Sequence, residues 1–126
     1  MHDVALDLLI LLAGVWLGGE RGVLLTQSSG IGNCLNMFSL ARVCRFPLLV
    51  LVTMRGEAGE FNPWQLPMGR NAGELLRLAG LRVTRVDEAE QVGPAVAAAG
   101  RTAFAGPAGA AVLIAQRLVG VKSFDG

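Results

Sequence analysis

Most of the residues that could do chemistry lie in two polar segments, each of which follows an apolar run. The first is Thr26-Gln27-Ser28-Ser29-Gly30-Ile31-Gly32-Asn33, which leads from an expected strand into an expected helix. Glycines allow the backbone to approach a ligand closely, and the N-terminus of a helix offers N–H groups without helical partners. The segment is either a ligand-binding turn or an ordinary tight strand-to-helix connection.

Several known motifs are excluded for this first segment. The third glycine of a dinucleotide fingerprint would fall at Leu35, and the lysine of a phosphate-binding P-loop is missing. Neither Ser28 nor Ser29 has glycine two residues before it, so no nucleophile elbow is present. A Ser–His pair lacks an obvious base, because the one histidine is His2.

The second segment runs from Arg55 to Arg70 after the apolar run Leu48 to Thr53. It is rich in glycine and proline, and we expect a loop of about 16 residues, which is long for a compact domain. Its polar side chains could meet a polar substrate, since binding residues gather on such loops. They are Arg55, Glu57, Glu60, Asn62 and Gln65. The alternative is a surface loop held by Pro63 and Trp64.

Two acidic residues near the start, Asp3 and Asp7, are four apart and therefore share a helix face. A carboxyl group buried among the neighbouring apolar side chains would have a raised pKa, which suits proton transfer. Alternatively, Asp3 stabilises the start of the helix through its dipole and Asp7 faces solvent.

The elements that must position these segments alternate between helix and strand. Apolar spacing and the glycine and proline signals predict helices at Met1 to Leu17, Asn33 to Arg45, Glu74 to Ala79 and Glu88 to Phe104. Strands are expected at Val23 to Gln27, Leu48 to Thr53, Leu81 to Val86 and Ala111 to Gln116. This order predicts an α/β domain with a mainly parallel sheet and helices on both faces. Such a sheet looks incomplete at its N-terminal edge, so either the chain is a fragment or a partner covers that edge.

Composition narrows the classes of function. With 52% hydrophobic and 17% charged residues, the chain is not disordered, and a net charge of +1 gives no reason to expect nucleic acid as a partner. The uncharged stretch Leu8 to Gly19 is shorter than the roughly 20 residues of a membrane span, so we expect no membrane association. Cys34 and Cys44 are expected to be reduced and packed inside a cytoplasmic protein. A metal site is not expected.

Four short stretches together resemble one enzyme family. Ala13 to Gly19, Leu25 to Asn33, Pro47 to Glu57 and Gln65 to Gly69 are similar, in order and spacing, to stretches of the sulfopyruvate and phosphonopyruvate decarboxylases. The shared patterns are A-G-A-x-L-x-G, Q-N-S-G-L-G-N, a strand followed by R-G-E, and Q-x-P-M-G. The resemblance covers nearly the whole chain.

The resemblance implies a thiamine-diphosphate-dependent enzyme, in which residues 1–126 form a single pyrimidine-binding (PYR) domain. The diphosphate and Mg²⁺ would be held by a partner domain or subunit marked by G-D-G…N, a motif that this chain lacks. By the same resemblance, residues 27–33 would bind the pyrimidine end of the cofactor: Gln27, Ser28, Ser29, Gly30, Ile31, Gly32 and Asn33. Residues of the second segment would border the substrate: Arg55, Gly56, Glu57 and Gln65.

One departure from the family concerns the catalytic acid. The family carries a glutamate on the helix before A-G-A, and the corresponding position is about Ala5. Asp7 is the nearby substitute, one methylene shorter. The family also has about 50 residues before this point, so the usual first strand and helix are expected to be missing here.

The sequence therefore predicts the PYR-domain subunit of a decarboxylase acting on a small anionic 2-oxo acid, in a homo- or hetero-oligomer. A non-catalytic assembly or regulatory subunit of the same fold is the alternative. A third possibility, suggested by the glycine turn alone, is an unrelated small domain that binds anions.

Overall fold

The computed structural model of the chain describes residues 4–106 and 108–119. It alternates helices and strands in the order that the sequence predicts. The elements are α1 (Val4–Leu17), β1 (Leu24–Gln27), the 3₁₀ turn η1 (Ser28–Gly30), α2 (Ile31–Cys44), β2 (Leu48–Thr53), the 3₁₀ turn η2 (Pro63–Gln65), α3 (Leu66–Leu78), β3 (Arg82–Val86), α4 (Ala89–Ala105), β4 (Gly109–Ile114) and α5 (Gln116–Val119).

The four strands form one parallel sheet in the order β1-β2-β4-β3. Leu25 of β1 lies opposite Leu51 of β2, which in turn lies opposite Val112 of β4. The central strands β2 and β4 read as nearly continuous apolar runs because both of their faces are covered by helices. The predicted α/β class with a parallel sheet is confirmed.

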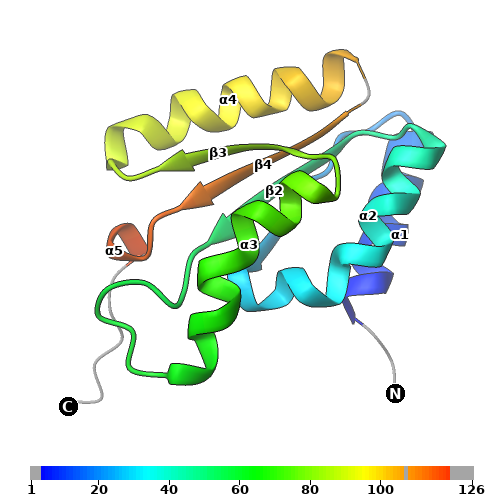
Figure 1. Cartoon of the computed structure of the whole chain (residues 1–126). Helices are drawn as coiled ribbons and strands as arrows, with labels where there is room; N and C mark the ends of the chain where they lie inside the picture. Colours follow the sequence, from blue (N-terminus) through cyan, green and yellow to red (C-terminus); the bar gives the residue numbers. More distant parts are fainter. Residues whose placement is uncertain (1–3, 107, 120–126) are drawn as a thin grey trace.

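Helices cover the two faces of the sheet unequally. The connections from β1 to β2 and from β2 to β3 step in one direction across the sheet and place α2 and α3 on one face, where α1 packs beside α2 (Figure 1). The connection from β3 to β4 steps back and places α4 on the other face. Right-handed crossovers require this division of the helices between the faces.

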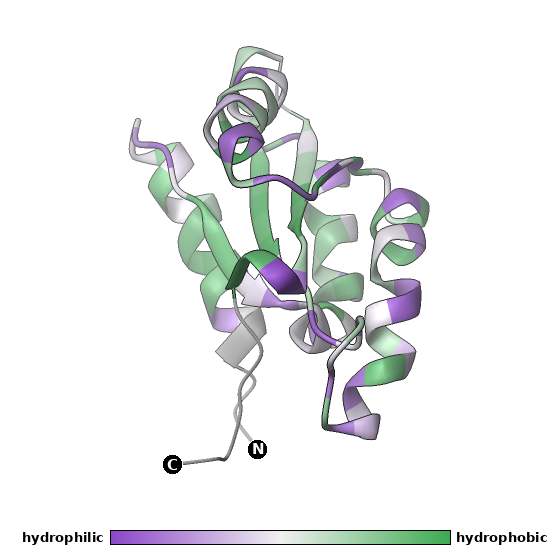
Figure 2. Ribbon diagram, turned by 90° about the vertical axis from the view of Figure 1, so that its left-hand side faces the viewer, coloured by the Kyte–Doolittle hydropathy of each residue, from purple (hydrophilic) through white to green (hydrophobic). Residues whose placement is uncertain are grey.

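Each face of the sheet has its own apolar core. One core joins β1, β2 and β4 to α1, α2 and α3, with Leu9, Ile31, Phe38 and Leu76 at its centre. The smaller core lies under α4 and contains Ala99 and Ala103, whose short side chains bring the helix close to the sheet. In Figure 2 the strands between the two helical layers are predominantly hydrophobic.

The second predicted loop is shorter than expected, because α3 begins at Leu66 and not at Glu74. Pro67 falls in the first turn of this helix, where its missing N–H has no helical partner to lose. Gly69 is required there, since a Cβ would lie 2.1 Å from the carbonyl oxygen of Arg55. Both residues thus belong to the start of a helix, although they look like loop signals.

Other boundaries shift by smaller amounts. The last strand ends at Ile114 and not at Gln116, which instead begins α5. Helix α2 begins at Ile31, two residues before the predicted Asn33, after a 3₁₀ turn in place of an open turn. Both cysteines are free, and Cys34 is buried, but Cys44 is exposed, which corrects the prediction of two packed thiols. Residues 1–3, 107 and 120–126 lie outside the described part, and so do the predictions for His2 and Asp3.

Strand β1 is less covered than the other strands on the α4 side. Helix α4 contacts β2, β3 and β4. Leu25 of β1 consequently exposes 69% of its surface, although it points to the same face as Leu51 and Val112. Within the described residues β1 pairs only with β2, so it forms one edge of the sheet.

Candidate functional site

The two polar segments of the sequence meet at the carboxyl edge of the sheet, where β1 and β2 end side by side. The buried Ser28 joins them: its hydroxyl oxygen accepts a hydrogen bond from the Arg55 backbone N–H at 3.0 Å. The Thr53 hydroxyl donates to the Thr26 carbonyl at 3.4 Å and closes the same junction. In open parallel sheets, ligands bind beyond this edge.

An open hollow of about 440 Å³ lies at the same strand ends, on the side of the sheet that α4 leaves uncovered. Its floor is apolar, and polar groups occupy one end. The lining residues are Leu25, Thr26, Gln27, Leu51, Thr53 and Ile114. Apolar walls with a few polar groups at one end are typical of small-molecule sites.

Arg55 does not present a free cation to this edge. Its Nε and Nη2 atoms donate to the two oxygens of Glu60 at 2.8 and 2.7 Å, a bidentate pair. The Phe61 ring centroid lies 5.7 Å from the guanidinium carbon. An anionic substrate would therefore meet an Arg55 that Glu60 has already neutralised, with the Nη1 edge as its remaining donor surface.

Glu60 organises the loop around itself. Besides Arg55, the backbone N–H groups of Gly56 and Asn62 donate to its two carboxylate oxygens at 2.9 and 3.2 Å. The hydrogen bonds from Arg55, with support from those two N–H groups, lower the pKa of Glu60 to about 2, against the opposing effect of burial. The same pair raises the pKa of Arg55 above its ordinary value.

Gln116 ties the loop to the end of β4. Its side-chain oxygen accepts from the Glu57 N–H at 3.0 Å, and its own backbone N–H donates to the Glu57 carboxylate at 2.9 Å. Arg85 of β3 pairs with the other Glu57 oxygen at 2.6 Å. Both oxygens of Glu57 are thus engaged within the chain, and this pairing raises the pKa of Arg85.

Gln65 lies at the far end of the loop and is buried. Its side-chain oxygen has no hydrogen-bond partner among the described residues, an unusual state for a buried acceptor. Its backbone closely approaches Gly56, where a Cβ would lie 2.4 Å from the Gln65 carbonyl oxygen. Gly56 also has a φ of 75°, a conformation that side chains other than glycine rarely adopt.

The remaining predicted site residues differ in which of their atoms a ligand could reach. Gln27 and Asn33 are exposed, whereas Ile31 is fully buried in the core, so only its backbone could meet a ligand. Helix α2 has no side-chain hydrogen bond at its N-cap, and its Ile31 N–H already donates to the Ser28 carbonyl of the preceding 3₁₀ turn. Asp7 lies in the first turn of α1 and is exposed.

The network around Gln116 and Arg85 was not predicted from the sequence. Glu57 and Gln116 are 59 residues apart, and no local pattern links them. The one available signal was the polar Gln116, two residues after the end of the apolar strand Gly109–Ile114, at the edge of the sheet where the other polar segments lie.

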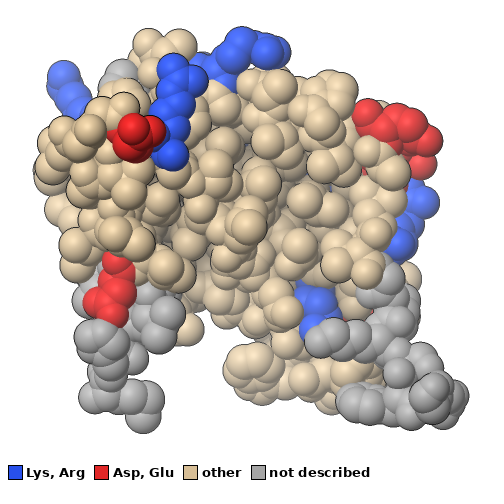
Figure 3. Space-filling view, turned by 180° about the vertical axis from the view of Figure 1, so that it is seen from behind, with Lys and Arg blue, Asp and Glu red and all other residues tan. Residues whose placement is uncertain are grey.

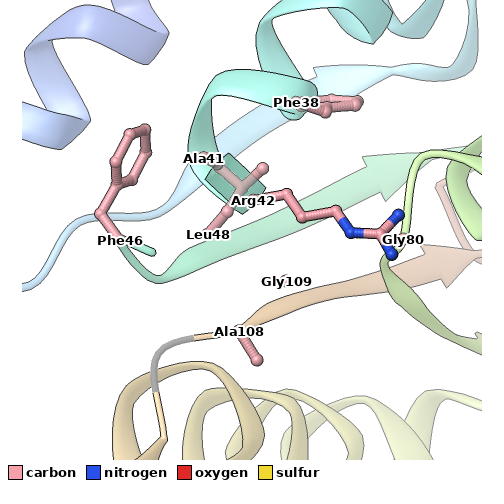
Figure 4. A pocket seen from close by; sticks show the side chains of 8 residues that line it. All are labelled: Phe38, Ala41, Arg42, Phe46, Leu48, Gly80, Ala108 and Gly109. Atoms are coloured by element: carbon pink, nitrogen blue, oxygen red, sulfur yellow. The ribbon is translucent and has the colours of Figure 1, made fainter. Parts of the chain in front are cut away.

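A second pocket, of about 230 Å³, opens at the opposite, amino edge of the sheet (Figure 4). Its walls are mainly apolar and include Phe38, Phe46 and Leu48. Arg42 extends across it towards Gly80. It is far poorer in polar side chains than the carboxyl edge, which remains the candidate site.

Two classes of feature are not found in the described part of the chain. None of its helices combines the length and apolar character needed to cross a bilayer. No cluster of three or more histidine, cysteine, aspartate or glutamate side chains is arranged to hold a metal ion there.

Comparison with curated proteins gives matches to two related activities. The chain is 40% identical over 67 residues to the sulfopyruvate decarboxylase subunit alpha of Methanothermobacter thermautotrophicus, covering 52% of this chain and 41% of that protein. It is 45% identical over 71 residues to a phosphonopyruvate decarboxylase of Streptomyces viridochromogenes, covering 55% and 18%. A sulfopyruvate decarboxylase of Methanosarcina acetivorans is 37% identical over 81 residues, 64% of this chain and 21% of that protein.

No family model matches the chain. The aligned stretches span about two fifths of the alpha subunit and about one fifth of the two longer proteins. The predicted similarity to the sulfopyruvate and phosphonopyruvate decarboxylases is thus confirmed, over roughly half to two thirds of the chain and not over nearly all of it.

Proposed function

We propose that the chain is the pyrimidine-binding subunit of a thiamine-diphosphate-dependent decarboxylase of a small anionic 2-oxo acid, such as sulfopyruvate or phosphonopyruvate. The observation that carries the proposal is the junction of Ser28 with Arg55, which brings the two decarboxylase-like segments together at one edge of the sheet. The proposed active site lies between this edge and a diphosphate-binding subunit.

The residues at this edge fit the pyrimidine end of such a cofactor. The apolar floor of Leu25, Leu51 and Ile114 suits a flat ring, and Gln27 and Thr53 add polar groups beside it. The unpaired oxygen of Gln65 is a further acceptor in the loop, although Gln65 does not line this hollow. Diphosphate and Mg²⁺ are assigned to the partner. When bound, the cofactor accepts the electrons released as the 2-oxo acid loses CO₂.

The chain's own side chains would position the substrate and move a proton. The Nη1 edge of Arg55 would contact the second anionic group of the substrate, while Glu60 fixes the orientation of the guanidinium. Glu57 would shape the loop through Gln116 and Arg85, since both of its oxygens are engaged within the chain. Asp7 takes the place of the family's glutamate as the proton-transferring acid.

The experiment combines the chain with a diphosphate-binding subunit that carries G-D-G…N and measures CO₂ release from sulfopyruvate and phosphonopyruvate. We expect turnover that requires thiamine diphosphate. Asp7→Asn should then reduce kcat by about 10²- to 10⁴-fold, the contribution of a positioned proton-transfer group. The matched control is Glu20→Gln, an exposed acid in the connection that enters β1 at the opposite, amino edge of the sheet.

The exposure of Asp7 favours one alternative, a non-catalytic assembly or regulatory subunit. In that case the complex forms, but Asp7→Asn leaves its turnover unchanged. If neither a complex nor cofactor binding is found with any such partner, the proposed function is wrong. Tight binding of inorganic phosphate by the chain alone would then favour an unrelated anion-binding domain.

A further inference from the structure

Helix α1 is apolar on every side, yet only one of its sides is buried. Asp7 is the one charged residue between Val4 and Leu17. A helix of this kind is normally buried all round. Here Leu9 is 1% exposed against α2, whereas Leu11 is 61% and Leu17 86% exposed. The outward side of α1 therefore requires an explanation other than packing within this chain.

The exposed residues form one continuous stripe along the helix. They follow the three- and four-residue spacing that places side chains on one face. We name them the α1 stripe: Ile10, Leu11, Gly14, Leu17 and Gly18. A Cβ at Gly14 would meet nothing within 4 Å, so the middle of the stripe leaves room for another backbone to approach.

The apolar surface continues from α1 onto α2. Leu40 and Val43 are exposed beside the stripe, and a hollow of about 250 Å³ lies between the two helices, lined in part by Trp16 and Leu17. Figure 3 views the molecule from the side on which α1 and β1 lie, and the middle of that face shows no charged side chain. Contiguous apolar surface of this kind marks an interaction site.

The two ends of the stripe carry opposite charges. Asp7 lies in the first turn of α1, and Arg45 lines the hollow beside Leu17 at the other end. A second copy that packs its α1 in the antiparallel direction would bring each Asp7 towards the Arg45 of its neighbour. A twofold axis produces this arrangement, because it makes the two contacts identical: Asp7 of each copy meets Arg45 of the other.

We propose that a second copy of this chain docks on the α1 stripe, with the two α1 helices antiparallel and Leu11 near the twofold axis. A helix of 14 residues is about 21 Å long, so the contact is smaller than the roughly 800 Å² per partner of a standard interface. We therefore expect a dissociation constant of about 10 µM and not a permanent dimer. This inference does not depend on the proposed function, but the two assign different roles to Asp7, which meets Arg45 of the second copy here and transfers a proton there.

The first test is sedimentation velocity on the full chain alone, from about 1 to 200 µM, a range chosen to bracket that constant. We expect a concentration-dependent monomer–dimer equilibrium, and Leu11→Glu should leave a monomer throughout. Leu78→Glu on α3, at a residue 81% exposed and outside the stripe, is the matched control and should leave the equilibrium unchanged. A wild-type chain that stays monomeric at the highest concentration would overturn the proposal.

A second test does not require a destabilising charge. In a Cys44→Ser background, Leu11→Cys places a thiol at the expected axis, where two copies can reach disulfide distance. We expect oxidation to yield a covalent dimer in high proportion, with Leu78→Cys as the control. Equal cross-linking at both positions would indicate random collision and reject the stripe as the interface.

The antiparallel direction has its own test. Asp7→Lys and Arg45→Glu should each weaken association at least tenfold, because each creates a like-charge contact across the axis. The double variant restores opposite charges and should recover most of the affinity. Additive weakening in the double variant would reject the antiparallel arrangement.

Discussion

At the scale of single residues, Glu60 is the centre of the candidate site. It accepts hydrogen bonds from the side chains of Arg55 and Gln116 and from the N–H groups of Gly56 and Asn62. Five donor atoms from four residues therefore converge on one carboxylate. The shape of the loop should depend on the charge of Glu60 more than on that of any other side chain in it.

The lowered pKa of Glu60 predicts an acid-induced loosening of the loop. The pKa of Glu60 falls from an ordinary 4.5 to about 2 in the folded chain, because the folded loop stabilises the charged carboxylate. The resulting stabilisation of the fold is therefore complete above pH about 4.5 and is lost as the pH falls towards 2. Fluorescence of Trp64 in a Trp16→Phe variant should report this transition. Glu60→Gln should abolish it, and a transition that persists in that variant would show that another group is responsible.

Ser28 predicts a stability effect at the junction of the two segments. Ser28→Ala leaves the Arg55 N–H without its acceptor in a buried position, so we expect a loss of about 1 to 3 kcal/mol in the free energy of unfolding. Urea denaturation measures it. Ser29→Ala, which removes a neighbouring hydroxyl with no comparable bond, is the control, and equal losses in both would contradict the role given to Ser28.

The sequence predicted the position of the candidate site better than the hydrogen bonds and ion pairs among its residues. The polar segments after the two strands were identifiable because parallel strands must end at one edge. The neutralisation of Arg55 by Glu60 could not be foreseen, since both residues looked equally available to a substrate. The pairing of Glu57 with Gln116 and Arg85 depends on three strands coming together, which local spacing does not encode.

At the scale of elements, the start of α3 shows that tertiary contacts can place in a helix residues that usually indicate a loop. Gly69 looks like a loop residue in the sequence, but it stands in a helix because the backbone of Arg55 passes against it. Pro67 likewise belongs to a first helical turn. The predicted loop was too long for this reason, whereas the strand β2 was predicted with its observed ends.

Gly69 gives a test of this close approach. Gly69→Ala should destabilise the fold by about 2 to 3 kcal/mol, because the new methyl group would overlap the Arg55 carbonyl oxygen. Gly93→Ala on α4, where a Cβ meets nothing within 4 Å, should instead stabilise by about 0.5 to 1 kcal/mol. Thermal denaturation compares the two, and a neutral Gly69→Ala would refute the contact.

At the scale of the whole molecule, the strand order concentrates stability in the middle of the sheet. Strands β2 and β4 are each paired on both sides and buried on both faces, while β1 has an exposed edge and an uncovered face. The alternation of helix and strand was enough to predict a parallel sheet with helices on both faces. It was not enough to predict the order β1-β2-β4-β3, which depends on which strand the α3 connection passes over.

Amide hydrogen exchange should reveal this difference in local stability between the central strands and β1. We expect the N–H groups of β2 and β4 to exchange most slowly and those of β1 to exchange faster, because local opening needs less free energy at an uncovered edge. Mass spectrometry of peptides from each strand provides the comparison. Protection of β1 equal to that of β2 at low protein concentration would contradict this difference.

Because only one of the two cysteines is exposed, the native protein carries a built-in probe of its own assembly. Cys34 is enclosed in the core, and Cys44 opens onto the hollow between α1 and α2. A thiol-reactive dye should therefore modify the native protein at one known position, without any engineered cysteine. Because that position borders the α1 stripe, the rate of labelling should fall as the protein concentration rises, so that simple chemical kinetics can follow assembly in real time.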